Sequence, residues 1–286
     1  MEEFLHFLDG RMTTPTWFGW FHIMWLVITL AACTLIYIFR KKISPKAVNI
    51  MVLVAGIVMI LFEVYKQINF SFNYVPGGGS YWDYQWYAFP FQFCSTPLYI
   101  MLLAGILRKG KVYDALTSYL ATFALIAGLM VMVYPGDVFI STIGINIQTM
   151  VVHCGMFTIG FLLLATRTVK LEYKNVFKAM IVFAIMAALA LGMDIIWHFC
   201  GNGETFNMFY ISPYTPCTLP LLNIIYEKVP YIVFLILYLI GFLLCAFIVM
   251  SFAKLFAWIE SKIQKSSDDA DTEQREAEIV KSETEQ

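Results

Sequence analysis

A cysteine between two prolines is the first residue in this chain that could do chemistry. Cys94 lies in the run Pro90-Phe91-Gln92-Phe93-Cys94-Ser95-Thr96-Pro97, at the start of a long apolar segment. Proline interrupts helical hydrogen bonding within a turn of itself, so backbone groups around Cys94 are expected to lose their usual partners. In hydrocarbon, such irregular backbone is tolerated only against other protein or a water-filled cavity. The motif therefore predicts a local break in a membrane-embedded helix.

A histidine inside another apolar segment is the natural partner for this thiol. His153 is followed directly by Cys154, and Cys94 and His153 are expected about five and six residues below the same membrane surface, which at about 1.5 Å per residue is a similar depth. An imidazole that takes the thiol proton leaves a thiolate able to attack an ester carbonyl. We predict Cys94 as the nucleophile and His153 as the base. The alternative is that both are ordinary packed core residues.

Five further polar residues are expected in the same outward-facing half of the protein. Intramembrane ionisable groups are costly and usually face a cavity, so these residues predict a polar chamber that binds substrate. The alternative is that they form interhelical hydrogen bonds that only hold the bundle. Asp194 and His198 stand one helical turn apart and could act as an acid–base pair, although no nucleophile accompanies them. The five residues are Glu63, Gln92, Asp194, His198 and Asn207.

The composition is that of an all-α membrane protein. Of 286 residues, 60% are hydrophobic and 14% are charged, and the mean hydropathy is +0.71. A soluble domain cannot bury so much apolar surface. We expect no nucleic acid partner, no cofactor and no metal, since the six cysteines show no close metal-ligand pairing. Cys200 and Cys217 stand at the two ends of one polar connection and could form a disulfide.

Seven apolar segments predict a seven-helix bundle embedded in the cell membrane, with three parts to the chain. These are an extracytoplasmic lead over residues 1–17, a membrane domain over 18–259 and an acidic tail over 260–286, interpreted as disordered or as a fraying helix. Most Lys and Arg residues fall on one side of the spans, which by the positive-inside rule places the N-terminus outside and the C-terminus in the cytoplasm. The fifth span is expected to begin near Ile147, because Asn146 and Gln148 are costly in a lipid-facing helix; a start at Thr142 would move His153 towards the midplane. The seven expected spans cover residues 18–39, 46–68, 89–107, 112–133, 147–167, 176–199 and 229–259.

Several of these residues together resemble the YwaF-like family of bacterial integral membrane proteins. The resemblance rests on Pro90-Phe91-Gln92-Phe93-Cys94, on Glu63, on His153 and on Asn207-Met208-Phe209-Tyr210. That family is similar to an animal membrane acyltransferase that moves polyunsaturated acyl chains onto lyso-ether phospholipids with a cysteine and a histidine. It is more distantly similar to the androgen-induced membrane hydrolases, which use threonine and histidine. The resemblance implies catalytic roles for Cys94 and His153, whereas Gln92 stands where family members often have histidine.

The sequence therefore favours a membrane-embedded lipid acyltransferase or lipid-ester hydrolase, whose expected partners are membrane lipids as acyl donor and acceptor. A second interpretation is a small-molecule or proton-coupled transporter or receptor with Glu63 and Asp194 in its binding cavity. A third is a scaffold for another membrane complex, in which the acidic tail is the docking arm.

Overall fold

The computed structural model describes residues 7–75 and 79–284, with side chains over 7–74, 79–136 and 138–266. Within them, helices account for most of the chain, as expected from the composition. The expected lead falls partly outside this range, at residues 1–6. The main helices are α2 (Trp20–Phe39), α3 (Pro45–Ser71), α4 (Thr96–Leu107), α5 (Lys111–Tyr119), α6 (Leu125–Val133), α7 (Ile143–Ala165), α8 (Tyr173–Cys200), α9 (Leu222–Lys228) and α10 (Tyr231–Thr284).

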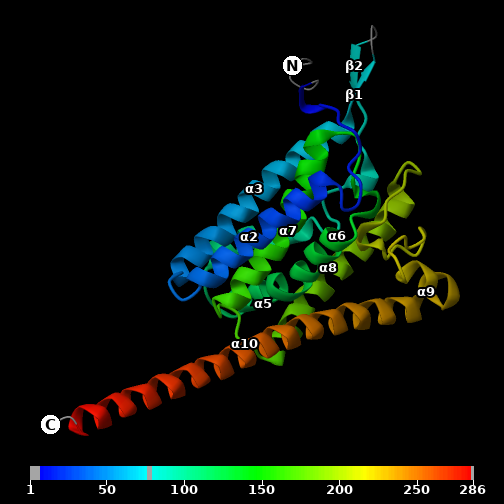
Figure 1. The fold of residues 1–286 in the computed structure, drawn as a ribbon. Helices are drawn as coiled ribbons and strands as arrows, with labels where there is room; N and C mark the ends of the chain where they lie inside the picture. The colour runs from blue at the N-terminus through cyan, green and yellow to red at the C-terminus, as the bar shows by residue number, and fades with distance from the viewer. Residues whose placement is uncertain (1–6, 76–78, 285–286) are drawn as a thin grey trace.

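Within residues 7–75 and 79–284, six helical segments are long and apolar enough to cross a membrane. Five of them are α2, α3, α7, α8 and the part of α10 up to Ser266. The sixth is one continuous segment made of α5, the π-helical turn η2 (Leu120–Ala124) and α6. In Figure 1, α2, α3, α7 and α8 form the body of the bundle, while α10 lies across it at a slant and continues past it. The expected seventh full span over 89–107 is not confirmed. Only its second part, α4, is a helix, and its 12 residues reach about 18 Å, which is short of a membrane crossing.

The prolines account for this short helix. Residues 86–88 form the 3₁₀ turn η1 (Trp86–Ala88), and the chain then passes through irregular turns before Thr96. Pro97 occupies the first turn of α4, where a missing backbone N–H costs nothing. The predicted break before Cys94 is therefore present, and it is longer than a kink.

Helix α7 begins at Ile143, four residues before the expected start at Ile147 and next to the alternative start at Thr142. The prediction was wrong because Asn146 and Gln148 do not face lipid; both are buried. The Asn146 side chain accepts a hydrogen bond from the Ile140 backbone N–H and donates one to the Ile140 carbonyl. Its polar atoms are thus satisfied by the turn that precedes α7.

One end of the bundle, called the outer end after its predicted orientation, carries small elements that the sequence did not predict. Strands β1 (Phe72–Val75) and β2 (Gly79–Trp82) form an antiparallel hairpin after α3. The 3₁₀ turns η3 (Gly136–Val138) and η4 (Met208–Tyr210) lie in the connections before α7 and after α8. The N-terminal segment joins the same end, because Arg11 pairs with Thr142 in an isolated β-bridge.

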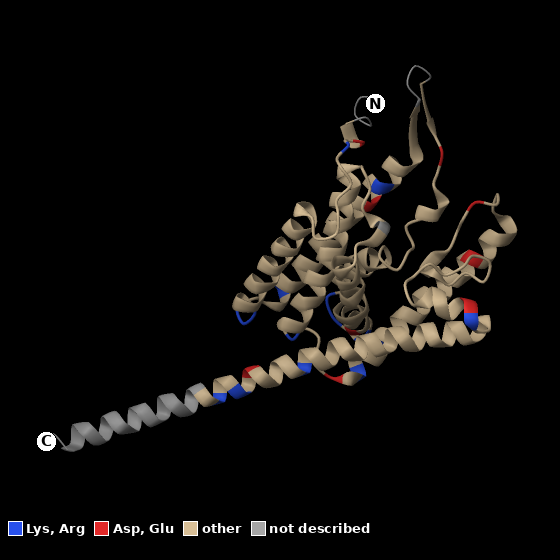
Figure 2. Ribbon diagram, turned by 45° about the vertical axis from the view of Figure 1, so that its right-hand side comes forward, with Lys and Arg blue, Asp and Glu red and all other residues tan. Residues whose placement is uncertain are grey.

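Basic residues gather at the opposite end of the bundle. Figure 2 shows Lys and Arg concentrated at the connections α2–α3, α4–α5 and α7–α8 and on the neighbouring part of α10. Arg40 forms an ion pair with Glu260 of α10, and Arg167 lies 3.9 Å from the same carboxylate. Lys178 of α8 lies 3.6 Å from Asp114 of α5. These contacts place the basic connections together at one end.

Candidate functional site

Cys94 lies in the turn that leads into α4, where it is half-buried. The turn is closed by the backbone N–H groups of Ser95 and Thr96, which donate to the Gln92 carbonyl at 2.9 and 3.0 Å. Within the described part of the chain, the backbone N–H of Phe93 has no hydrogen-bond acceptor, and the Cys94 thiol interacts with its own backbone N–H and with the Ser95 side chain. The thiol therefore lies beside backbone donors at the N-terminal end of a helix, where partial positive charge favours an anion.

His153 is buried on α7, with 6% of its surface exposed. Its Nδ1 lies 2.7 Å from the Thr149 carbonyl oxygen. A carbonyl can only accept, so Nδ1 carries the proton and Nε2 keeps its lone pair. Nε2 has no hydrogen-bond partner among the described residues. The imidazole is thus held in the tautomer that a general base requires.

Two close helix contacts show that Cys94 and His153 lie at similar depth. Gly56 of α3 packs against Leu98, Met101 and Leu102 of α4, while Met59 of α3 packs against Gly155 of α7. Cys94 stands about six residues outward of the first contact, and His153 about two residues outward of the second, at about 1.5 Å per residue. Both positions correspond to the part of α3 just before Glu63 and lie about one residue apart along it, so the two levels differ by about 1.5 Å.

The His153 side chain leaves α7 on a different side from the one that faces α3. On α7, Gly155 faces α3, and His153 is about 160° round the helix from it, since successive residues turn by about 100°. The side of α7 at His153 is covered by α6, because Gly128 packs directly against the His153 carbonyl oxygen. For the predicted contact with the Cys94 thiol, the His153 imidazole must therefore extend around α7 towards the interior of the bundle.

A buried polar network surrounds Glu63 on α3. Lys66 Nζ lies 2.8 Å from Glu63 Oε1, and Gln67 Nε2 donates to the same oxygen at 2.9 Å. Gln67 also donates to the Ala88 carbonyl, and the Tyr84 hydroxyl donates to Gln67 Oε1. Burial and the Glu63 carboxylate raise the pKa of Tyr84, so this hydroxyl stays a donor.

Lys66 is the member of this site that sequence reasoning missed. The sequence does carry a signal for it, because a spacing of three residues from Glu63 is typical of an ion pair on one helix face. Its ammonium is buried with the Glu63 carboxylate, at the level of α3 that corresponds to both Cys94 and His153. Lys66 is therefore the basic member of the polar network around Glu63.

Gln92, Asp194 and Asn207 come together, but their side chains hold a loop. Gln92 donates to the Asn207 carbonyl at 3.0 Å and accepts from the Phe209 N–H at 3.1 Å. Asp194 Oδ1 accepts from the Met208 N–H at 2.7 Å. Asn207 donates to the Thr215 and Pro216 carbonyls and accepts from the Ser212 N–H. The Asn207 amide group thus uses both of its N–H donors, whereas Gln92 uses one of its two.

The loop that these residues hold is strained and deeply packed. Phe209 and Tyr210 adopt left-handed backbone conformations, with φ of 57° and 58°, which side-chain-bearing residues rarely adopt. The Tyr238 hydroxyl donates to the Phe209 carbonyl at 3.0 Å. Burial raises the pKa of Tyr210 to about 12, with the neighbouring Cys94 thiol a further cause. The loop after α8 therefore forms one wall of the cysteine site.

His198 lies apart from this network. Its ring stacks on Tyr214 with centroids 3.6 Å apart, and it is exposed, whereas Asp194 is buried. The two residues therefore stand one turn apart on α8 in different surroundings. Cys200 and Cys217 are both free thiols.

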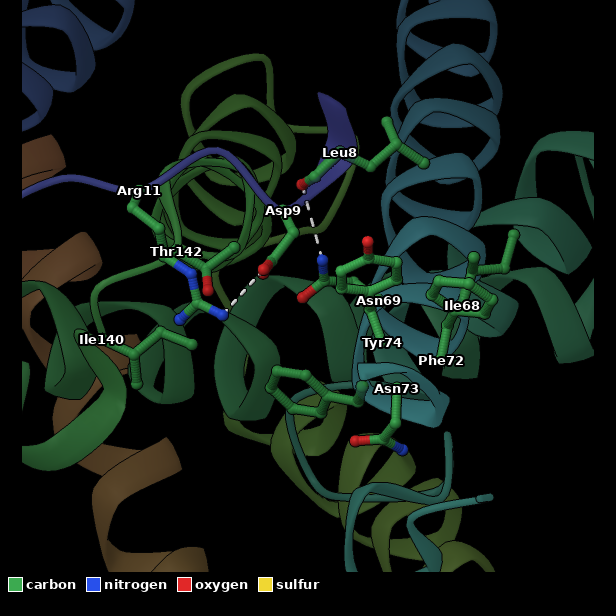
Figure 3. A pocket seen from close by; sticks show the side chains of 11 residues that line it. Leu8, Asp9, Arg11, Ile68, Asn69, Phe72, Asn73, Tyr74, Ile140 and Thr142 are labelled. Carbon is green, nitrogen blue, oxygen red and sulfur yellow. Dashed lines mark hydrogen bonds and ion pairs between the residues drawn. The ribbon is translucent and has the colours of Figure 1, made fainter. Parts of the chain in front are cut away.

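Two pockets are present outside this site. The first, of about 350 Å³, lies at the outer end between the N-terminal segment, the end of α3 and the start of α7. Figure 3 shows the Arg11 guanidinium and the Asp9 carboxylate meeting at this pocket, with Asn69 beside Leu8. The second, of about 420 Å³, is an apolar groove on the flank formed by α2, α6 and α7. Its α7 wall begins at Phe157, one turn from His153.

No group of three or more His, Cys, Asp or Glu side chains in the described ranges could hold a metal ion. Comparison with the curated proteins finds no match, and comparison with solved structures finds none either. A family model described as the TMEM164 family matches residues 17–252, which is most of the chain and all of the region that carries the site. The chain belongs to the TMEM164 family, a family of membrane proteins.

Proposed function

We propose that this protein is a membrane lipid acyltransferase or lipid-ester hydrolase, with Cys94 as nucleophile and His153 as base. The observation that carries the proposal is the bond between His153 Nδ1 and the Thr149 carbonyl, which leaves Nε2 available to take a proton. The similar depth of Cys94 and His153 along α3 supports their meeting. Membership of a membrane protein family fits a substrate that is itself a membrane lipid.

The first half-reaction would transfer the acyl chain to Cys94. The thiol proton passes to His153 Nε2, and the thiolate sulfur attacks the ester carbonyl carbon. A C–S bond forms while the carbonyl π electrons move to oxygen, where the Phe93 backbone N–H would stabilise the negative charge. The intermediate then collapses, the C–O bond to glycerol breaks, and the alkoxide takes the proton from His153.

The second half-reaction would regenerate the thiol. A lysophospholipid hydroxyl or water gives its proton to His153 and attacks the thioester carbonyl, and the C–S bond then breaks. The leaving thiolate takes back the proton from His153. A lysophospholipid acceptor makes the protein a transferase, and water makes it a hydrolase.

The chemistry would take place in the half of the bundle away from the basic connections. If those connections are cytoplasmic, as the positive-inside rule predicts, the site faces the outer leaflet of the cell membrane. The apolar groove that reaches α7 at Phe157 supports an acyl substrate, because an acyl chain lying in it would bring its ester end towards His153.

The test is acyl transfer by the purified full chain in detergent, with a labelled phospholipid as donor and lysophospholipid or water as acceptor. We expect transfer by the wild type, and neither transfer nor covalent acyl labelling in Cys94→Ala. Undiminished transfer by a folded Cys94→Ala protein would overturn the assignment of the nucleophile.

A second candidate is a small-molecule or proton-coupled transporter that uses Glu63 and Asp194. The observation that favours it is Asp194 Oδ2, a buried oxygen without a hydrogen-bond partner in the described structure. Such an atom is costly unless it binds a proton or a ligand. Absence of acyl transfer in every variant, together with proton uptake by proteoliposomes that Asp194→Asn abolishes, would favour this function.

A further inference from the structure

The ion pair on α3 points into the space between the two helices that carry Cys94 and His153. On a helix, successive residues turn by about 100°. Taking Gly56 as the direction of α4, Met59 lies about 60° away in the direction of α7, and both contacts are observed. Glu63 falls about 20° from Gly56, on the side towards Met59. Its carboxylate therefore faces the seam between α4 and α7.

The Lys66 ammonium lies beside the Glu63 carboxylate at this seam. The backbone of Lys66 lies almost one turn outward of Glu63, but its ammonium is 2.8 Å from the Glu63 carboxylate. Only 13% of the Lys66 side chain and 6% of the Glu63 side chain are exposed. Two buried charges are retained only at a cost in desolvation, so an ion pair at this depth is weak evidence for stability alone.

We propose that the Lys66 ammonium is the electrostatic group of the cysteine site, where it stabilises the thiolate of Cys94. This role of Lys66 adds to the proposed function, and its importance for turnover rests on Cys94 being the nucleophile. Lys66 is a positioning residue in this role, because it acts on the sulfur through space. The other ionisable groups around Cys94 are Glu63, which lies on α3 with Lys66, Tyr119 of α5 and Tyr210 of η4. His153 of α7 is expected there too. Lys66 is the basic group among them that carries a positive charge.

The test measures alkylation of Cys94 by iodoacetamide in the purified full chain, from pH 6 to pH 10, read at the Cys94 peptide by mass spectrometry. Only the thiolate reacts, so the rate reports its population. We expect Lys66→Met to slow the reaction at pH 7.5 about tenfold, the effect of one pKa unit. Lys66→Arg should restore the rate to within about threefold, since it keeps the charge in a different shape. Lys228→Met, which removes an exposed charge in the outer connection, is the matched control.

The sign of the charge separates electrostatics from structural damage. Glu63→Gln should speed alkylation, because it removes a negative charge beside the thiol. The double variant Glu63→Gln with Lys66→Met leaves no buried charge unpaired, and it should react more slowly than Glu63→Gln alone. An unchanged rate in a folded Lys66→Met protein, or slowing in both single variants, would overturn the proposal.

Alkylation needs no turnover, so the two proposals fail separately. If acyl transfer requires Cys94 but the alkylation rate is the same in Lys66→Met and the wild type, the role of Lys66 is rejected and the proposed function is kept. If Cys94→Ala keeps full transfer activity, the proposed function falls whatever the alkylation rates are.

Discussion

At the scale of residues, the molecule carries a thiol at a helix start and, on another helix at a similar depth, an imidazole held in one tautomer. The bond from Nδ1 to the Thr149 carbonyl orients the ring and leaves Nε2 as the proton acceptor. The Phe93 backbone N–H beside Cys94 has no acceptor among the described residues. In the proposed function, each feature would supply one need of thiol-dependent acyl transfer: a base, a nucleophile and a donor for the developing oxyanion.

Replacement of the imidazole should therefore disable the thiol without removing it. We expect His153→Ala to lower acyl transfer by about 10²–10⁴-fold, the usual effect of losing a positioned acid–base group. Cys154→Ala is the control, because Cys154 lies about 100° round α7 and is buried in a cluster with Phe21 and Met132. Its transfer rate should stay close to that of the wild type. A His153→Ala protein with near-normal transfer would rule out His153 as the base.

Sequence patterns identified the reactive residue types better than their partners. Cys94 and Glu63 stand out because a thiol between prolines and a carboxylate in an apolar run are conspicuous. The ion pair of Lys66 with Glu63 needed the helix direction of α3, and the use of Gln92 as a clamp needed the path of a distant loop. Such long-range hydrogen bonds leave no local periodicity to detect.

At the scale of elements, the site depends on close packing between α6 and α7. A side chain at Gly128 would place Cβ 2.4 Å from the His153 carbonyl oxygen and 2.9 Å from the Phe157 nitrogen. Both are backbone atoms, so the helices themselves must move apart. The absence of a side chain at Gly128 therefore keeps α6 over the histidine.

We expect Gly128→Ala to destabilise the protein by about 1–3 kcal/mol, the usual effect of overpacking, and to weaken acyl transfer. The measurement is the midpoint of thermal unfolding in detergent. Gly192→Ala on α8 is the matched control, since a Cβ there meets nothing within 4 Å. Equal midpoints for the two variants would show that α6 and α7 are not packed this closely.

The loop after α8 should loosen when its anchor on the cysteine turn is removed. Gln92→Leu loses two hydrogen bonds to Asn207 and Phe209, each worth about 0.5–1.5 kcal/mol. We expect faster amide hydrogen exchange over residues 204–218 and reduced acyl transfer. Gln85→Leu is the control, because that side chain bonds only to Asp83. Exchange that is unchanged in Gln92→Leu would contradict the clamp.

The elements themselves were predictable to different degrees. Long apolar runs predicted the spans, because length and hydropathy are local properties. The shortening of the third span to α4 and the early start of α7 were not predicted. In both places, polar or irregular backbone is buried against protein, as with Asn146 against Ile140, and hydropathy cannot tell protein from lipid as the neighbour.

At the scale of the whole molecule, charge distinguishes the two ends. The connections that carry Arg40, Arg108 and Arg167 share one end with the charged part of α10, which Glu260 ties to the bundle. The other end holds the hairpin, the N-terminal segment and the strained loop near Cys94. By the positive-inside rule the basic end is cytoplasmic, so the cysteine site and the polar pocket at Arg11 should both face outwards.

Labelling with a membrane-impermeant maleimide in intact cells tests this orientation. The background carries Cys200→Ser, because Cys200 is an exposed thiol at the end predicted to face outwards. We expect Ser80→Cys, on the exposed hairpin, to be labelled in intact cells. Lys109→Cys, in the exposed α4–α5 turn, should be labelled only after the membrane is permeabilised. Labelling of Lys109→Cys but not of Ser80→Cys in intact cells would show the opposite orientation in the membrane. The proposed lipid substrate would then come from the cytoplasmic leaflet.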